Sequence, residues 1–161
     1  IVRALEAIPA GDRLPLVVVG NGREYLEEVH SYVCRYKLSR KFFLFTDIYY
    51  NRLLRYLYEC ATAFVFPSFN EGFGLPVVEA QAAGCPAVIS DIPIFREIAP
   101  HAVFVPVNGA PEAHAADWVK AIRSLEDEAV RERVIVDGLS DVHRYSWRDS
   151  ALKLLEVVRG L

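Results

Sequence analysis

The stretch FPSFNEGFGLPVVEAQAAGCP, residues 66–86, decides how this chain folds. It follows an apolar, β-prone run from Ala61 to Phe66, and it continues through a glycine-containing loop into a short helix. Pro76 suits a first helical position, because the N–H group that proline lacks would be unpaired there anyway. Gly84 is typical of the residue just after a helix, and Pro86 prevents the helix from continuing. The stretch therefore predicts a strand, a loop and a helix in direct succession.

The loop of this stretch predicts a binding site for a phosphorylated ligand. Gly72 and Gly74 free the backbone to take angles that other residues avoid. A helix that starts after such a loop offers unpaired N–H groups and the positive end of its dipole, which favour phosphate. Glu71 and Glu79 would repel a phosphate if they pointed at it, so they suit hydroxyl groups on either side of it. The implied ligand is a nucleotide sugar, and the alternative is that both acids are solvated surface residues.

Length and composition indicate one ordinary globular domain. The 161 residues are enough to bury a core, and the net charge is −3. Basic residues are scattered, which argues against nucleic-acid binding, and no apolar run has the length of a membrane span. The histidines and cysteines lack metal-binding spacing, so we expect no metal site. We interpret Cys34, Cys60 and Cys85 as reduced, partly buried thiols of a cytoplasmic protein.

Apolar runs alternate with helical patterns over the first two thirds of the chain. The run LPLVVVG at 14–20 predicts a strand buried on both faces, as in parallel sheets. The predicted strands are 14–20, 41–45, 62–66, 87–90 and 102–105, and the helices between them are 1–8, 23–37, 51–60, 76–83 and 93–98. This alternation favours an α/β fold with a Rossmann-like, doubly wound parallel sheet. Ligands of such sheets bind at the carboxyl ends of strands, where the glycine-containing loop lies.

The remainder of the chain, residues 111–161, has only helical patterns. We predict helices over 111–125 and 127–142, and a last helix over 147–158 that Ser146 caps. The apolar stripe of the last helix consists of Ala151, Leu152, Leu155 and Val158. No linker or repeat divides the chain, so we expect a single domain over residues 1–161 with a helical C-terminal part.

The pattern EGFGLPVVE, from Glu71 to Glu79, resembles the signature of family 4 retaining glycosyltransferases, which have the GT-B fold. The resemblance extends to VFPS at 65–68, EAQAAGCP at 79–86, SDIP at 90–93 with Glu97, GNG at 20–22 and Tyr145-Ser146-Trp147. It covers nearly the whole chain as the C-terminal, donor-binding half of such an enzyme. It implies that the acceptor-binding domain, and a strand and loop with diphosphate-binding Arg and Lys, would precede residue 1. The 161 residues alone would then not turn over a substrate.

This resemblance assigns roles to the residues of the loop. Glu71 would be the catalytic residue that binds or orients the transferred sugar, and Glu79 would accept hydrogen bonds from the ribose hydroxyls. The donor diphosphate would be held by backbone amides of the loop residues Gly72, Phe73, Gly74 and Leu75. The family usually needs no metal and no other cofactor, because the leaving diphosphate is stabilised by amides, basic side chains and the helix dipole.

Two interpretations of the turn Gly20-Asn21-Gly22 stay open. It lines the same donor site, or it only closes a corner between a strand and a helix. A dinucleotide fingerprint is disfavoured, because Tyr25 occupies the position of its third glycine.

The resemblance implies a function for the whole enzyme. It would transfer a hexose, with mannose favoured, from a UDP- or GDP-sugar to a glycan or lipid-linked acceptor during surface polysaccharide biosynthesis. We expect it to be cytoplasmic, with peripheral membrane association of the full-length enzyme. Two alternatives stay open: another GT-B enzyme such as a sugar-nucleotide epimerase, and a non-catalytic nucleotide-binding module.

Overall fold

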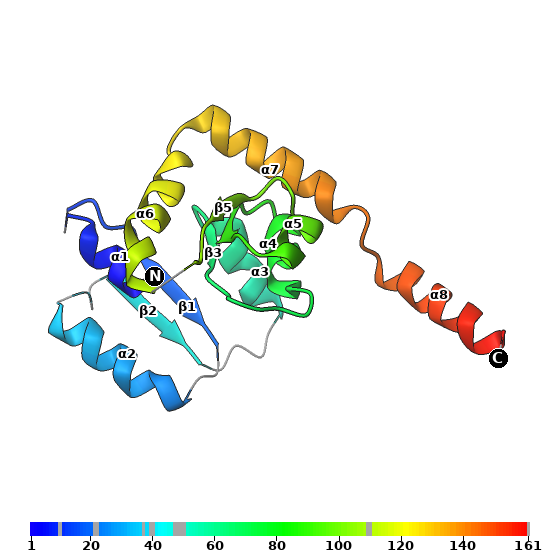
Figure 1. The fold of residues 1–161 in the computed structure, drawn as a ribbon, viewed down its shortest axis with the longest axis horizontal. Coiled ribbons are helices and arrows are strands. Elements are labelled where there is room, and N and C mark those ends of the chain that lie inside the picture. Colours follow the sequence, from blue (N-terminus) through cyan, green and yellow to red (C-terminus); the bar gives the residue numbers. More distant parts are fainter. Residues whose placement is uncertain are drawn as a thin grey trace.

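The chain forms an α/β fold in which parallel strands alternate with helices (Figure 1). The structure is a computed structural model, and it describes residues 1–161 except 10, 21–22, 37, 39–40, 47–50, 109–110 and 161. The strands are β1 (Leu16–Val19), β2 (Phe42–Phe45), β3 (Phe64–Phe66), β4 (Ala87–Ser90) and β5 (Val103–Val105). The helices are α1 (Val2–Ala7), α2 (Arg23–Arg35), α3 (Asn51–Cys60), α4 (Leu75–Ala82), α5 (Pro93–Ile98), α6 (Ala115–Ser124), α7 (Glu128–Val142) and α8 (Trp147–Arg159), with a 3₁₀ turn, η2 (Pro111–His114), before α6.

The strands pair in parallel, as the alternation of apolar runs and helices predicted. β1 pairs with β2, with Leu16 opposite Phe42, and β4 lies between β3 and β5. The pairing differs from the prediction in one respect, because the strands form two separate groups of two and three instead of one sheet. Within the described residues, no ladder of hydrogen bonds joins β1 to β3.

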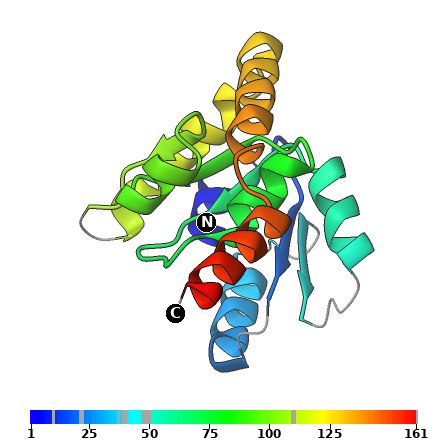
Figure 2. The same cartoon turned by 90° about the vertical axis from the view of Figure 1, so that its right-hand side faces the viewer.

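Helices cover both faces of the strands, which makes the fold doubly wound. On one face, Val88 and Val105 pack with Ala4 of α1 and Trp118 of α6. On the other face, Ile89 packs with residues of α4 and α5, and Tyr58 of α3 lies edge-on to Phe64 with ring centroids 5.4 Å apart. Figure 2 shows α1 and α2 on one side of β1 and β2, with α3 on the other. The hydroxyl of Tyr32 on α2 donates a hydrogen bond to Glu6 on α1 at 2.5 Å.

The core is concentrated around β4, whose residues are all fully buried. This agrees with its apolar sequence, since a central parallel strand is covered on both faces. The prediction that strand 14–20 is buried on both faces is wrong, because Val17 and Val19 are each 40% exposed. In the described part of the chain, the face of β1 that carries these two side chains has incomplete cover.

The helix stop that the sequence predicted after α4 is present in full. Gly84 has a left-handed backbone with φ of 73°. Its N–H group donates to the carbonyl of Gln81 at 2.9 Å, and the N–H group of Cys85 donates to the carbonyl of Ala80 at 2.9 Å. These two bonds form a Schellman motif, which satisfies carbonyls that would otherwise be unpaired at the helix end.

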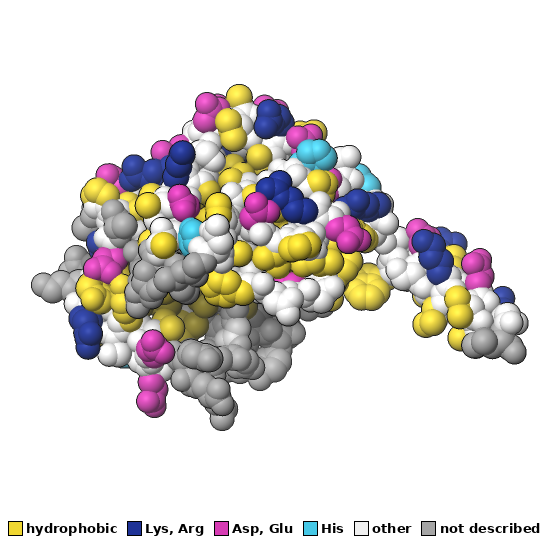
Figure 3. All heavy atoms as spheres, viewed as in Figure 1, with side chains coloured by type: hydrophobic (Ala, Val, Ile, Leu, Met, Phe, Trp, Pro, Cys, Tyr) yellow, Lys and Arg dark blue, Asp and Glu magenta, His cyan; other side chains and the backbone are white. Residues whose placement is uncertain are grey.

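The last helix, α8, extends away from the other elements (Figure 1). Ser146 caps it as predicted, since its hydroxyl accepts a hydrogen bond from the N–H group of Asp149 at 3.2 Å. The predicted apolar stripe is present but buries none of its side chains, and hydrophobic atoms are visible along α8 in Figure 3. Trp147 is 81% exposed.

The prediction that all three cysteines are partly buried is wrong. Cys34 and Cys60 are exposed free thiols, and only Cys85 is buried. Burial raises the pKa of the Cys85 thiol to about 11. On α3, Leu53 is exposed, and Tyr58 is the side chain that packs against Phe64 of the sheet. None of the described helices combines the length and the apolar character needed to cross a bilayer.

The contact between α4 and α7 contains a buried amide. Gln81 on α4 is 2% exposed, and neither its amide nitrogen nor its amide oxygen has a hydrogen-bond partner among the described residues. Gly138 on α7 makes room for it, because a Cβ atom at Gly138 would lie 2.9 Å from Nε2 of Gln81. A buried polar group without a partner lowers stability.

We expect Gln81→Met to raise the free energy of unfolding by about 1–2 kcal/mol, because methionine fills a similar volume without burying an unpaired amide. Urea unfolding followed by tryptophan fluorescence measures this change. Gly138→Ala is the matched control and should destabilise the chain, since its methyl group would press on the side chain of residue 81. A less stable Gln81→Met variant would show that the amide has a bonding partner, such as a buried water.

Candidate functional site

The candidate site is formed by residues 67–74, which we term the glycine loop, and by the start of α4. The loop leaves the carboxyl end of β3 and enters α4 directly. In Figure 1 the arrowheads of β1 and β2 point toward the side on which this loop lies. The site thus occupies the edge of the fold at which ligands of parallel α/β sheets bind.

Gly74 gives the loop its shape. It has φ of 91° and ψ of 48°, a left-handed conformation that residues with a side chain rarely adopt. It is also buried against α5, where an added Cβ would lie 2.7 Å from Cε1 of Phe95. Gly72 is different, because its φ is not positive and a Cβ there would meet no atom within 4 Å. The prediction that both glycines supply unusual backbone angles is therefore confirmed for Gly74 and wrong for Gly72.

The backbone amides at the start of α4 are available to a ligand. No side chain caps this helix. Within the described residues, the N–H groups of Phe73, Gly74 and Leu75 donate no hydrogen bond, whereas the N–H group of Val77 donates to the carbonyl of Gly74 at 2.9 Å. Unpaired donors at the positive end of a helix dipole favour a bound anion.

The two acids predicted to flank these amides lie in different surroundings. Glu71 is half-buried and accepts a hydrogen bond at 2.6 Å from the hydroxyl of Ser68. Glu79 is exposed on α4 and faces the region of Tyr58 on α3. The pKa of Tyr58 is raised to about 12, mainly by burial and secondly by the charge of Glu79. The spacing of three residues between Ser68 and Glu71 is the signal in the sequence that could have indicated this contact.

A further ion pair lies at the carboxyl end of β4. Arg96 donates two hydrogen bonds to the carboxylate of Asp91, at 2.7 and 2.9 Å. The Arg96 hydrogen bond holds the pKa of Asp91 below its usual range. The guanidinium group also lies 3.8 Å above the ring centroid of Phe104. Arg96 is therefore held in place by two partners of the chain itself.

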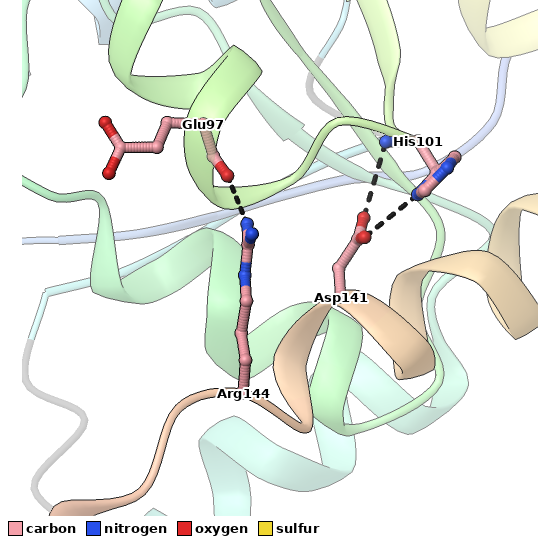
Figure 4. Close-up of polar contacts among 4 residues, drawn as sticks. All are labelled: Glu97, His101, Asp141 and Arg144. Atoms are coloured by element: carbon pink, nitrogen blue, oxygen red, sulfur yellow. Dashed lines mark hydrogen bonds and ion pairs between the residues drawn. The ribbon is translucent and has the colours of Figure 1, made fainter.

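The C-terminal end of α7 is anchored to the segment after α5, and the sequence did not reveal this. Asp141 is buried and accepts hydrogen bonds from the backbone N–H of His101 at 3.3 Å and from its Nδ1 atom at 2.9 Å (Figure 4). Arg144 donates to the backbone carbonyl of Glu97, whose carboxylate points away from this contact. The signal in the sequence that could have indicated this anchor is the acidic residue Asp141 at a position where α7 faces inward.

This anchor positions the residue that supports the glycine loop. Tyr145 lies three residues after the end of α7, and its ring is edge-on to the ring of Phe73, with centroids 5.2 Å apart and planes at 87°. Aromatic rings favour this geometry. The loop therefore packs on α5 through Gly74 and on the end of α7 through Phe73.

The remaining predicted site residues, Gly20 and Gly22, belong to the turn that follows β1 in the sequence. Gly20 is at the end of β1, and its N–H group donates to the carbonyl of Phe45 at 3.1 Å, which ties the end of β1 to β2. Gly22 lies outside the described residues. Among the residues that the structure describes, no group of three His, Cys, Asp or Glu side chains could hold a metal ion.

The doubly wound fold, with unpaired amides and two acids at the carboxyl edge of its strands, defines a candidate nucleotide-binding protein of the α/β class. The family model described as glycosyl transferases group 1 matches residues 1–138, and the chain belongs to this family. The family model agrees with the resemblance seen in the pattern from Glu71 to Glu79.

Curated relatives are similar over different shares of the chain. O-antigen chain mannosyltransferase B of Escherichia coli is 34% identical over 108 residues, which are 67% of this chain and 28% of that protein. An uncharacterized glycosyltransferase of Methanocaldococcus jannaschii is 31% identical over 167 residues, covering 99% of this chain and 40% of the relative. The chain thus spans well under half the length of these two relatives.

Solved structures support the GT-B fold. Anabaena HepE in complex with UDP-glucose superimposes with a TM-score of 0.84 at 15% identity, covering 99% of this chain and 44% of that one. The C-terminal domain of LpcC, a group 1 glycosyl transferase from Francisella tularensis, superimposes with a TM-score of 0.73 at 20% identity, covering 88% and 75%. At these identities the similarity shows the fold alone, and it confirms the predicted Rossmann-like half of a GT-B fold.

We expect Gly74→Ala to destabilise the chain by about 2–4 kcal/mol, because a methyl group there meets both a left-handed backbone and the ring of Phe95. Urea unfolding measures the change. Gly72→Ala is the matched control two residues away, and we expect it to shift stability by less than about 0.5 kcal/mol. Equal effects of the two substitutions would contradict the role assigned to Gly74.

Proposed function

We propose that this chain is a single donor-binding domain of a hexosyltransferase that uses a nucleotide sugar. The observation that carries the proposal is the row of unpaired amides at Phe73, Gly74 and Leu75, held at the start of α4 by a buried left-handed glycine. These amides would bind the donor diphosphate and stabilise the charge that develops on it as the sugar leaves.

The two acids fit the two ends of such a donor. Glu71, oriented by the hydroxyl of Ser68, would bind the transferred sugar and act as the catalytic residue. Glu79, exposed one turn into α4, would accept hydrogen bonds from the ribose hydroxyls. Both carboxylates would then contact hydroxyl groups, while Gly72 and its neighbours approach the phosphates. Such a site needs no metal, because amides and the helix dipole supply the positive charge.

We propose that the donor is a UDP- or GDP-sugar and that the transferred hexose is mannose, with retention of the anomeric configuration. Two of the relatives are named as O-antigen chain mannosyltransferases, which supports mannose and a context of surface polysaccharide biosynthesis. The solved structures with bound UDP or UDP-glucose support a nucleotide sugar of the uridine type equally well. The glycan or lipid-linked acceptor would be bound by a further domain of the whole enzyme, working in the cytoplasm at the membrane surface.

The test is a calorimetric titration of the chain with GDP-mannose and UDP-glucose. We expect one of them to bind, and Glu79→Gln to weaken that binding by about tenfold, because a hydrogen bond to a charged acceptor is worth more than one to a neutral amide. Glu132→Gln, on the exposed surface of α7, is the control and should leave the affinity unchanged.

Circular dichroism of each variant separates lost binding from lost folding. A folded parent chain that binds neither nucleotide sugar would contradict the donor-site assignment. Unchanged affinity in Glu79→Gln would overturn the ribose role of Glu79 alone.

A further inference from the structure

The ring of Tyr145, in the segment between α7 and α8, is held by contacts of different kinds. Besides its edge-on contact with Phe73, it meets the guanidinium group of Arg144, whose carbon lies 5.0 Å from the Tyr145 ring centroid. The ring also packs against the buried cluster that contains Val77 and Phe95. Its hydroxyl group has no hydrogen-bond partner among the described residues. The surface of the ring, and not the hydroxyl group, therefore holds the side chain of Tyr145 in place.

The residues on both sides of Tyr145 fix its backbone. Arg144 donates a hydrogen bond to the backbone carbonyl of Glu97 in α5 (Figure 4). The N–H group of Tyr145 itself donates to the carbonyl of Val142 at 3.0 Å. On the other side, the hydroxyl group of Ser146 caps α8. Because both sequence neighbours are engaged in this way, Tyr145 presents a fixed ring to the glycine loop.

Phe73 is the residue of the glycine loop that depends on this support. The residue before it, Gly72, has open space where a Cβ atom would lie, and glycine leaves the backbone free to turn. The N–H groups of Gly74 and Leu75, by contrast, are fixed by the buried position of Gly74 and by the first turn of α4. In the described part of the chain, Tyr145 is the one aromatic ring that contacts Phe73. The direction of the Phe73 N–H group therefore depends on where Tyr145 holds the ring of Phe73.

We propose that Tyr145 is a positioning residue of the donor site. Its ring holds the side chain of Phe73 and thereby directs the backbone N–H group of Phe73 toward the donor diphosphate. The identity of this ligand rests on the proposed function, whereas the positioning concerns contacts within the chain alone. Because the N–H group binds phosphate and not the nucleoside part of the donor, loss of the Tyr145 ring weakens the binding of nucleoside diphosphates and leaves that of nucleosides unchanged.

The first test needs no ligand, because amide NMR relaxation of the chain reports the order of individual N–H groups. In Tyr145→Leu, which removes the ring but keeps an apolar side chain, we expect the order parameter of the Phe73 amide to fall from about 0.85 to below about 0.6. The amides of Gly74 and Leu75 should stay ordered. Tyr145→Phe keeps the ring and should match the parent chain. A Phe73 amide that is as ordered in Tyr145→Leu as in the parent chain would overturn the positioning role.

The second test is a calorimetric double-mutant cycle with GDP and with UDP. Tyr145→Leu and Phe73→Leu remove the same contact from its two sides, so each should weaken the binding of the nucleotide by about three- to tenfold, the range expected for an edge-on aromatic pair. The double variant should lose no more affinity than one single variant. Tyr36→Leu is the matched control, because it removes one ring of the pair formed with Tyr32, which no described contact joins to the glycine loop.

Guanosine and uridine, followed by amide chemical shifts, should bind each variant as they bind the parent chain, and the same spectra show that each variant is folded. Additive losses in the double variant, or an equal loss of affinity for nucleosides, would overturn the proposal, because either result means a general disturbance of the fold. A parent chain that binds neither GDP nor UDP would contradict the donor-site assignment. The order of the Phe73 amide without ligand would still decide whether Tyr145 positions it, so the two failures are distinct.

Discussion

The close approach of Gly74 to Phe95 is the constraint on which the candidate site depends. The distance of 2.7 Å from an added Cβ to the ring leaves room for glycine alone. Phe95 is itself fully buried and packs against Phe66 of β3, with centroids 5.8 Å apart. The end of the strand, the glycine loop and α5 therefore share one set of contacts. The amides at the start of α4 are held by the hydrophobic core, so a ligand would meet donors that are already oriented.

A second set of contacts holds the same loop from the side of α7. The hydrogen bonds between His101 and Asp141 fix the end of this helix, and Tyr145 packs against Phe73. Three residues before Asp141, Gly138 allows α4 to come close to α7, and the amide of Gln81 is buried without a partner among the described residues. α7 and the residue Tyr145 that lies beyond it thus make contacts at both ends of α4, the helix that begins at the candidate site.

Local chemistry explains which features could be predicted from the sequence. The stop at Gly84 and the cap at Ser146 depend on neighbouring residues only, and both were predicted correctly. The contact between His101 and Asp141 joins residues 40 positions apart, so no local pattern encodes it. The exposure of α8 depends on what surrounds it, and its apolar stripe would look the same in a buried helix. Gly72 and Gly74 are equivalent in sequence, and only the position of Phe95 distinguishes them.

The two groups of strands differ in how completely their apolar side chains are covered by other elements. Around β4, side chains of α4, α5 and α6 close the core on both faces, and the candidate site rests on this part. β1 and β2 form a two-stranded ladder with exposed valine and phenylalanine side chains, and such small sheets gain little stability alone. The glycine loop and its amides can therefore keep their geometry through the core around β4.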